Sequence, residues 1–159
     1  MDIFPTKILL ATDGSEEAQL ALSTAVDQAN STNSELHLVT VGPWKPDLAY
    51  ATHEASFHWQ SYEEVIEAIG KEAQQILDEQ VKKIEEAGGT VQEAYVRRGR
   101  KDQEIVRLGE EIGAGLIVIG SRGRAGARRA LMGSVSDSVV RHAHCPVLVV
   151  RKQKQQAAL

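Results

Sequence analysis

The sequence has little cysteine and no long apolar run. Its single cysteine, Cys145, cannot form an internal disulfide or a thiolate zinc cluster within one chain. The longest wholly apolar stretch, residues 146–150, is far too short to cross a bilayer. Residues 1–7 contain no basic segment followed by an apolar core, so we expect no signal peptide. We therefore expect a cytoplasmic protein in a reducing compartment.

Positive charge is also in deficit. The chain carries 18 Lys and Arg against 22 Asp and Glu, which gives a net charge of -4. Nucleic acids and acidic membrane surfaces bind proteins through a dominant basic face, so we expect neither as a partner, and any anion site must be local. The 159 residues, of which 42% are hydrophobic, fit one globular domain. We expect it to span residues 1–152, with a flexible tail at 153–159.

Two kinds of apolar pattern alternate along the chain. Short segments rich in β-branched residues, bounded by Gly, Pro, Asp or Asn, predict five strands, at 7–12, 35–41, 90–96, 116–119 and 146–150. Apolar residues at helical spacing predict four helices, at 15–30, 61–87, 101–112 and 134–142. This alternation predicts an α/β fold: a single-domain, doubly wound, parallel five-stranded sheet with helices on both faces, Rossmann-like.

In such a sheet, ligands bind beyond the carboxyl ends of the strands, where the winding direction reverses. The loop after the first strand contains one glycine, Gly14, and two glutamates, so it lacks the G-x-G-x-x-G pattern and we expect no phosphate there. The Gly70-Lys71 pair lies inside a predicted helix, which excludes a P-loop. The carboxylate of Asp13 could accept hydrogen bonds from ribose hydroxyls or hold a metal's water, or it could be an ordinary turn or cap aspartate.

The loop at 120–136, after the fourth strand, concentrates glycine and positive charge. Glycine permits positive backbone angles and lets backbone amides approach a ligand closely. The helix that begins at Ser134 and contains Ser136 offers free N–H groups and the positive end of its dipole to an anion. Four arginines lie in this one loop of an acidic protein: Arg122, Arg124, Arg128 and Arg129. The loop predicts a polyphosphate cradle, and the alternative is a flexible basic surface loop with a serine cap.

Three stretches resemble the ATP-binding branch of the universal stress protein family. The spacing Gly120-x2-Gly123-x9-Gly133-Ser134 is similar to the nucleotide-binding signature of that branch. Residues 7–15 resemble the family's first strand and turn, and residues 141–150 resemble its closing helix and strand. The resemblance covers nearly the whole chain and implies an adenine nucleotide α-hydrolase-like fold.

The resemblance also implies a ligand and its site. It implies ATP, with Mg2+ held mainly by the phosphates, an adenine pocket in which the backbone of Val41 contacts the base, and Asp13 near the ribose. The residues assigned to the nucleotide are Thr12, Asp13, Val41, Gly120, Ser121, Arg122, Gly123, Gly133, Ser134, Val135 and Ser136. It further implies a homodimer in which the fifth strands pair edge to edge, because residues 147–150 would form an uncovered apolar edge.

Two functions of different classes follow. One is an ATP-binding switch or sensor in the stress response, with slow or no ATP hydrolysis. The other is an adenine-nucleotide α-hydrolase or adenylating enzyme. Efficient phosphoryl transfer needs a positioned base and metal-binding carboxylates, and beyond Asp13 no acidic residue lies in the loops expected to face the phosphates. The sequence therefore favours the first function. A nucleotide-free stress protein would be favoured if the glycine spacing were broken, and it is intact.

Two further groups of residues invite a functional interpretation. Five of the seven aromatic residues gather in one stretch: Trp44, Tyr50, Phe57, Trp59 and Tyr62. Loops this long act as lids or partner contacts, and the alternative is a hydrophobic plug over the core or in a dimer contact. His142, His144 and Cys145 have the order of a metal cluster, but we expect the histidines to end a helix, where imidazolium favours the carbonyl end.

Overall fold

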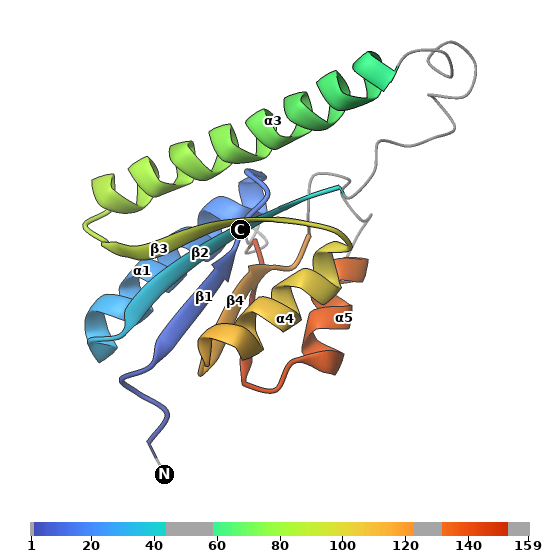
Figure 1. Cartoon of the computed structure of the whole chain (residues 1–159). Coiled ribbons are helices and arrows are strands. Elements are labelled where there is room, and N and C mark those ends of the chain that lie inside the picture. The colour runs from blue at the N-terminus through green and yellow to red at the C-terminus, as the bar shows by residue number, and fades with distance from the viewer. Residues whose placement is uncertain (1, 44–58, 123–131, 153–159) are drawn as a thin grey trace, which may run out of the picture.

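A five-stranded parallel sheet forms the middle layer of the protein (Figure 1). The computed structural model describes residues 2–43, 59–122 and 132–152, and of residues 59–62 it describes only the backbone. The strands are β1 (Lys7–Ala11), β2 (Glu35–Gly42), β3 (Val91–Arg98), β4 (Leu116–Gly120) and β5 (Val147–Val150). Their order across the sheet is β3-β2-β1-β4-β5, and each neighbouring pair is parallel.

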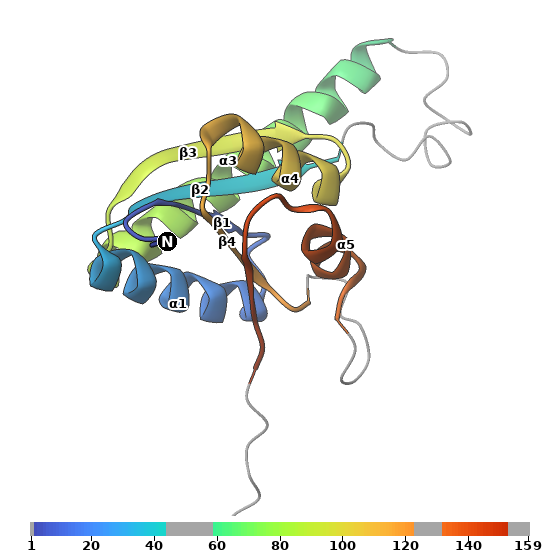
Figure 2. The same ribbon diagram turned by 90° about the horizontal axis from the view of Figure 1, so that it is seen from below.

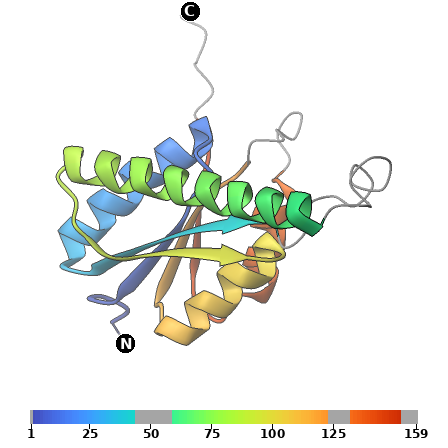
Figure 3. The same cartoon turned by 45° about the horizontal axis from the view of Figure 1, so that its top comes forward.

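Helices cover both faces of this sheet. They are α1 (Glu16–Thr32), α3 (Trp59–Glu86), α4 (Lys101–Ile112) and α5 (Ser134–His142). Helices α1 and α3 pack on one face, and α4 and α5 pack on the other (Figure 3). The predicted fold class is confirmed, and the predicted strands and helices lie within two residues of their expected bounds.

Local sequence determines where the helices begin and end. Ser15 caps α1, because its side-chain oxygen accepts a hydrogen bond from the Ala18 amide at 3.2 Å. The same helix ends at Asn33, whose φ of 54° is left-handed. Helix α4 ends at Gly113 with a φ of 69°, a conformation that glycine adopts without strain. Residues close along the chain therefore set the start of α1 and the ends of α1 and α4.

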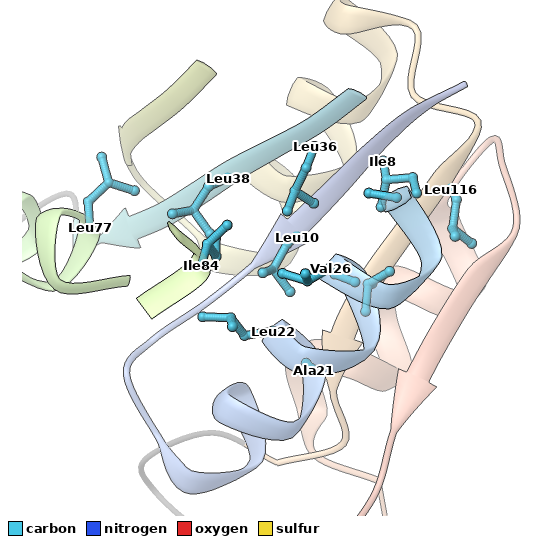
Figure 4. Close-up of a cluster of buried hydrophobic side chains, with 13 residues drawn as sticks. Ile8, Leu10, Ala21, Leu22, Val26, Leu36, Leu38, Leu77, Ile84 and Leu116 are labelled. Atoms are coloured by element: carbon cyan, nitrogen blue, oxygen red, sulfur yellow. The ribbon is translucent and has the colours of Figure 1, made fainter. Parts of the chain in front are cut away.

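Alternate residues of the strands point to opposite faces of the sheet and build two cores. Ile8 and Leu10 of β1 pack against α1 and α3, in a cluster that includes Leu22 and Ile84 (Figure 4). Leu9, between them, points the other way and packs with residues of α4 and α5. Strands β1 and β4 are therefore buried on both faces, which explains their continuous apolar sequences.

The winding of the sheet reverses at β1. From β1 the chain passes through α1 to β2 and through α3 to β3, and α4 then carries it back to β4 on the other side of β1. The carboxyl ends of β1, β2 and β4 therefore lie together at one edge of the sheet, beside the reversal. This is the edge at which the sequence predicts a ligand.

Several predicted features lie outside the described residues. They are Gly123, Arg124, Arg128, Arg129, the aromatic residues between 44 and 58, and the tail at 153–159. Within the ranges that the structure does describe, none of the helices is long and apolar enough to span a membrane.

The core on the α1 side predicts a large difference between two leucines of one helix. Leu22 is 3% exposed inside this core, whereas Leu20 is 38% exposed. We expect Leu22→Ala to lower the free energy of unfolding by about 2–5 kcal/mol, because it leaves a cavity. Leu20→Ala should change it by about 0.5 kcal/mol or less. Urea unfolding followed by circular dichroism measures both values, and equal losses would contradict the packing of α1 on the sheet.

Candidate functional site

A cavity of about 540 Å³ opens at the carboxyl edge of the sheet, where the winding reverses. Its volume is typical of small-molecule sites. Ten predicted site residues line it: Thr12, Asp13, Val41, Gly120, Ser121, Arg122, Gly133, Ser134, Val135 and Ser136. Gly123, the other predicted residue, lies outside the described part of the chain. The fold therefore brings together loop residues that are far apart in the sequence.

One part of the cavity wall is apolar. Val39 and Val41 of β2, Ile119 of β4 and Ile105 of α4 line it. These side chains belong to the core between the sheet and the α4–α5 layer or pack against it. A wall of this kind binds an apolar or aromatic ring by removing its surface from water.

The first turn of α5 forms another part of the wall. Its N-cap, Gly133, has no side chain to cap the first amides, and its carbonyl accepts hydrogen bonds from the Asp137 amide at 3.0 Å and the Ser136 hydroxyl at 3.0 Å. Amides in the first turn have no acceptor within the helix and carry the positive end of its dipole. Residues 134–136 of this turn and the guanidinium-bearing Arg122 line the cavity. This part of the wall suits an anion.

The start of α1, by contrast, is already occupied by contacts within the protein. Ser15 caps it, and Glu16 and Glu17 lie in its first turn. Glu16 pairs with Lys152 at 2.7 Å, and Glu17 accepts a hydrogen bond from the Ser121 hydroxyl at 3.0 Å. A phosphate at this helix would meet two carboxylates, which agrees with the expectation that none docks there.

Ser121 joins the end of β4 to three other elements. Its amide donates to the Val150 carbonyl at 2.9 Å, and its carbonyl accepts from the Gly133 amide at 2.7 Å. The carbonyl also accepts from the Ser136 hydroxyl at 3.0 Å, and the Ser121 hydroxyl donates to Glu17. Both serines are buried. Although they line the cavity, their hydroxyl protons are used within the protein, and what they contribute is the position of the loop after β4 against α5.

Close approach of backbone atoms, rather than backbone angle, requires Gly120 and Gly133. Neither glycine has a positive φ, and that of Gly133 is -63°. A Cβ atom at Gly133 would lie 3.1 Å from the Ser121 carbonyl oxygen, and one at Gly120 would lie 3.1 Å from the backbone of Glu17. From the sequence we expected these glycines to have positive φ angles and to let backbone amides approach a ligand. Instead, the atoms nearest to Gly120 and Gly133 include backbone atoms of the protein itself.

Asp13 lies in the turn between β1 and α1. Its Oδ1 accepts a hydrogen bond from the Ser15 amide at 2.9 Å, as in an ordinary Asx turn. The same residue lines the cavity. The two interpretations that the sequence left open are therefore compatible, because the turn hydrogen bond holds the carboxylate where the cavity opens.

Six lining residues were not predicted from the sequence: Ala11, Ala18, Val39, Lys101, Ile105 and Ile119. The apolar ones carry the same sequence signal as any core position. Lys101 is different, because it is the first residue of α4 and follows β3 closely. All five strands run in the same direction, so the loop after β3 also reaches the carboxyl edge. Considering that loop with the others would have found Lys101.

Helices α4 and α5 lie side by side (Figure 2), and the buried carboxylate of Asp102 joins them. Asp102 accepts hydrogen bonds from the Ser138 hydroxyl at 2.7 Å and from Arg100 Nε at 2.9 Å. Burial acts to raise the pKa of Asp102, but the hydrogen bonds from Ser138, Arg100 and the Gln103 amide outweigh it and hold this pKa below its ordinary value. The pair of helices that frames the cavity is therefore joined by an ionised aspartate.

The histidines near the chain's end have separate partners. His142 ends α5, and its Nδ1 donates to the Ser138 carbonyl at 2.8 Å, whereas His144 Nε2 lies 2.6 Å from Glu110 Oε1. Burial raises the pKa of the Cys145 thiol. Among the residues whose placement the structure gives, no group of three or more His, Cys, Asp or Glu side chains could hold a metal ion.

Comparison with known proteins shows the family of this chain. The model of the universal stress protein family matches residues 5–151. The chain belongs to the universal stress protein family. This universal stress protein is 34% identical to universal stress protein MJ0531 of Methanocaldococcus jannaschii over 150 residues, which cover 94% of this chain and 84% of the relative.

Two solved structures extend the comparison. The hypothetical protein MJ0577 has a TM-score of 0.77 to this universal stress protein and 27% identity, over 96% of this chain and 99% of that one. A universal stress protein in complex with cAMP has a TM-score of 0.61 and 26% identity, over 91% of this chain and 94% of that one. Both share the fold described above.

The hydrogen bond from Ser138 predicts a pH-dependent contribution to stability. Because the pKa of Asp102 is depressed in the folded protein, this contribution is present above about pH 3.9, the pKa of an unfolded aspartate, and is lost as the pH falls through the lower folded value. We expect Ser138→Ala to lower the free energy of unfolding at pH 7 by about 1.5 kcal/mol. The loss should decrease as the pH falls through the folded pKa of Asp102.

Denaturant unfolding across this pH range measures the effect. Ser31→Ala is the matched control, because Ser31 is exposed on α1 and donates to the Gln28 carbonyl instead of a carboxylate. A loss in Ser138→Ala that is the same at every pH would mean that the carboxylate of Asp102 is not the group that the hydroxyl stabilises.

Proposed function

We propose that this universal stress protein binds an adenine nucleotide in the cavity, with ATP and Mg2+ as its ligand, and acts in the cytoplasm as a nucleotide-dependent switch or sensor in the stress response. The observation that carries the proposal is that one cavity joins an apolar wall at β2 to the uncapped start of α5. An adenine nucleotide has the two matching ends, an apolar ring and a phosphate chain. The cAMP complex of a 26% identical family member supports this class of ligand.

Each part of the nucleotide has a counterpart in the cavity. The base would contact Val39 and Val41 at the end of β2, with the backbone of Val41 as its polar contact. The ribose would lie at Asp13, and the phosphates at the amides of residues 134–136 and at Arg122. Lys101 adds a second cation to the described lining of the cavity, in a protein whose net charge is -4. A local positive site of this kind attracts a polyphosphate without making the whole surface basic.

The scarcity of carboxylates supports a switch rather than an efficient hydrolase. Asp13 is the one carboxylate among the described residues that line the cavity, and it already accepts the Ser15 amide. Phosphoryl transfer at a high rate needs further groups to hold metal and to activate water. In the proposal, Mg2+ is therefore held mainly by the phosphate oxygens, and any hydrolysis of ATP is slow.

The edge of the sheet at β5 supports the proposed homodimer. β5 is the last strand in the sheet order, and its four residues are half-buried. The carbonyls of Pro146 and Val150 point toward β4, where they accept hydrogen bonds from the amides of Ile117 and Ser121. Because alternate residues of a strand direct their backbone groups the same way, Val147 and Val149 direct theirs to the open edge. A second copy related by a two-fold axis would pair with these groups.

The nucleotide proposal predicts graded losses in three variants. Ser134→Ala removes one hydroxyl and keeps the amide, so we expect a loss of about 1 kcal/mol in binding, roughly fivefold. Asp13→Ala should cost more for a ligand with ribose than for free triphosphate. Gly133→Val should abolish measurable binding. A Cβ atom at residue 133 would already lie 3.1 Å from the Ser121 carbonyl oxygen, and valine adds two methyl groups to it. Isothermal titration calorimetry with Mg-ATP measures all three.

Ser23→Ala is the control for this series, because Ser23 is exposed on α1 and donates to the Gln19 carbonyl. It should bind Mg-ATP as the unmodified protein does. Absence of binding to any adenine nucleotide at millimolar concentration, or unchanged binding in Gly133→Val, would refute the proposed phosphate site.

The dimer proposal predicts a position-specific effect of proline in β5. Val149→Pro removes an amide that points to the open edge and leaves the hydrogen bonds between β4 and β5 in place, so it should convert the dimer to a folded monomer. Val149→Ala keeps the amide and should remain dimeric. Size-exclusion chromatography with light scattering gives the masses. A folded Val149→Pro variant that is still a dimer would exclude pairing through β5.

A further inference from the structure

One polar side chain interrupts the buried stripe of α3. The residues of this helix that face the sheet and are buried include Ala73, Leu77, Gln80 and Ile84, and Gln80 is 1% exposed. Burying an amide without hydrogen bonds costs free energy, and an apolar residue would fit this stripe without that cost. Helical periodicity alone assigns position 80 to the core and gives no reason for a polar residue there. The reason must lie in what the amide contacts.

The Gln80 side chain bonds to the turn at the carboxyl end of β1. Its Oε1 accepts the hydroxyl of Thr12 at 3.3 Å and Nε2 of Gln19, on α1, at 3.2 Å. Thr12 lines the cavity and is 6% exposed. The helix that follows β2 is therefore hydrogen-bonded to the loop that follows β1, across 68 residues of sequence.

The direction of these hydrogen bonds orients the turn. A hydroxyl has one proton, and Thr12 donates it to Gln80, so the lone pairs of the Thr12 oxygen are left to accept. They accept the Gly14 amide at 3.3 Å. Gly14 has a φ of 77°, and the next amide, that of Ser15, donates to Asp13 Oδ1. Gln80 thus holds the hydroxyl in the orientation that supports the turn, in which Asp13 directly precedes the two bonded amides.

A second polar group lies beside this network. The last paired residues of β1 and β2 are Ala11 and Val39, so Thr12, just after β1, comes next to Thr40, two residues before the end of β2. By strand alternation Thr40 points to the α1–α3 face, like Leu38, and it is 3% exposed. Its hydroxyl is the one buried side-chain polar atom in the described residues that has no hydrogen-bond partner. The layer between α3 and the ends of β1 and β2 is therefore polar, although the rest of this core is apolar.

We propose that Gln80 is a positioning residue for the nucleotide site: through Thr12 it holds the turn that presents Asp13 to the ribose. This inference rests on the proposed nucleotide binding for its ligand, whereas the link from Gln80 to the turn rests on the hydrogen bonds alone. Gln80 does not itself line the cavity, but it hydrogen-bonds to Thr12, which does. It acts by reducing the freedom of Thr12 and of the Gly14 amide.

The test compares ATP with 2′,3′-dideoxy-ATP, which lacks the ribose hydroxyls that Asp13 would bind. In Gln80→Leu, ATP should bind about fivefold more weakly, the loss expected for one neutral hydrogen bond, while dideoxy-ATP binds as it does to the unmodified protein. The ratio of the two affinities is the readout, because general loosening of the core would weaken both ligands together. Gln75→Leu is the matched control, since it makes the same change on the exposed side of α3.

A double-mutant cycle with Thr12→Val tests the route. If Gln80 acts through the Thr12 hydroxyl, Gln80→Leu should cause no further loss of ATP affinity once that hydroxyl is gone. If the two substitutions lower ATP affinity additively, Gln80 does not act through the Thr12 hydroxyl. Gln80→Met replaces Gln80→Leu if the leucine variant is unfolded, because its unbranched side chain has a similar shape.

Hydrogen exchange of the Gly14 amide, measured by NMR without nucleotide, separates this inference from the proposed function. Exchange should be several-fold faster in Gln80→Leu than in Gln75→Leu. Unchanged exchange, or an unchanged ratio of ATP to dideoxy-ATP affinity, would overturn the positioning role. If the unmodified protein binds neither nucleotide, the proposed function and the ribose contact both fail, while the exchange result still decides whether Gln80 holds the turn.

Discussion

The cavity depends on the hydrogen bonds of Ser121. This residue follows the last position of β4, and its carbonyl accepts both the Gly133 amide and the Ser136 hydroxyl. These two bonds set the start of α5 against the end of β4, so that the amides of its first turn line the cavity instead of facing solvent elsewhere. The Ser121 amide donates to Val150, which places the same residue at the end of β5. The proposed nucleotide site and the proposed dimer edge are therefore connected by one buried peptide unit.

Charge at the carboxyl edge is divided between two helix starts. At α1, the Ser15 side chain accepts a hydrogen bond from an amide of the first turn, and the carboxylates of Glu16 and Glu17 lie at the positive end of the helix dipole. At α5, the N-cap is a glycine with no side chain to bond the first amides, and the acidic residue of the first turn, Asp137, pairs with Arg141. The close contact between Gly133 and Ser121 explains the glycine, because any side chain there would press on a carbonyl oxygen. The uncapped amides that suit an anion are thus a consequence of tight backbone packing.

The sequence predicted most of the fold because the relevant physics is local. Strand and helix assignments follow from periodicity, and the cap at Ser15 and the left-handed end at Gly113 involve residues close along the chain. The edge that carries the cavity also followed, because a parallel sheet directs the loops after its strands to one side. Gly133, Ser134 and Asp13, which line the cavity, were assigned in this way. What the sequence did not reveal was which polar atoms the protein itself uses.

Which polar atoms bond within the protein depends on contacts between segments distant in sequence, and only the tertiary structure decided this. The Ser121 hydroxyl bonds to Glu17 across 104 residues, and Gln80 bonds to Thr12 across 68. No periodicity or spacing encodes such pairs, because they arise only when the helices are packed on the sheet. Lys101 differs from these pairs, because the loop after β3 already brings it to the carboxyl edge, and the packing of α4 decides only that it lines the cavity. The sequence by itself determined the strands, the helices and the edge of the sheet at which the cavity opens, and packing determined which side chains line that cavity.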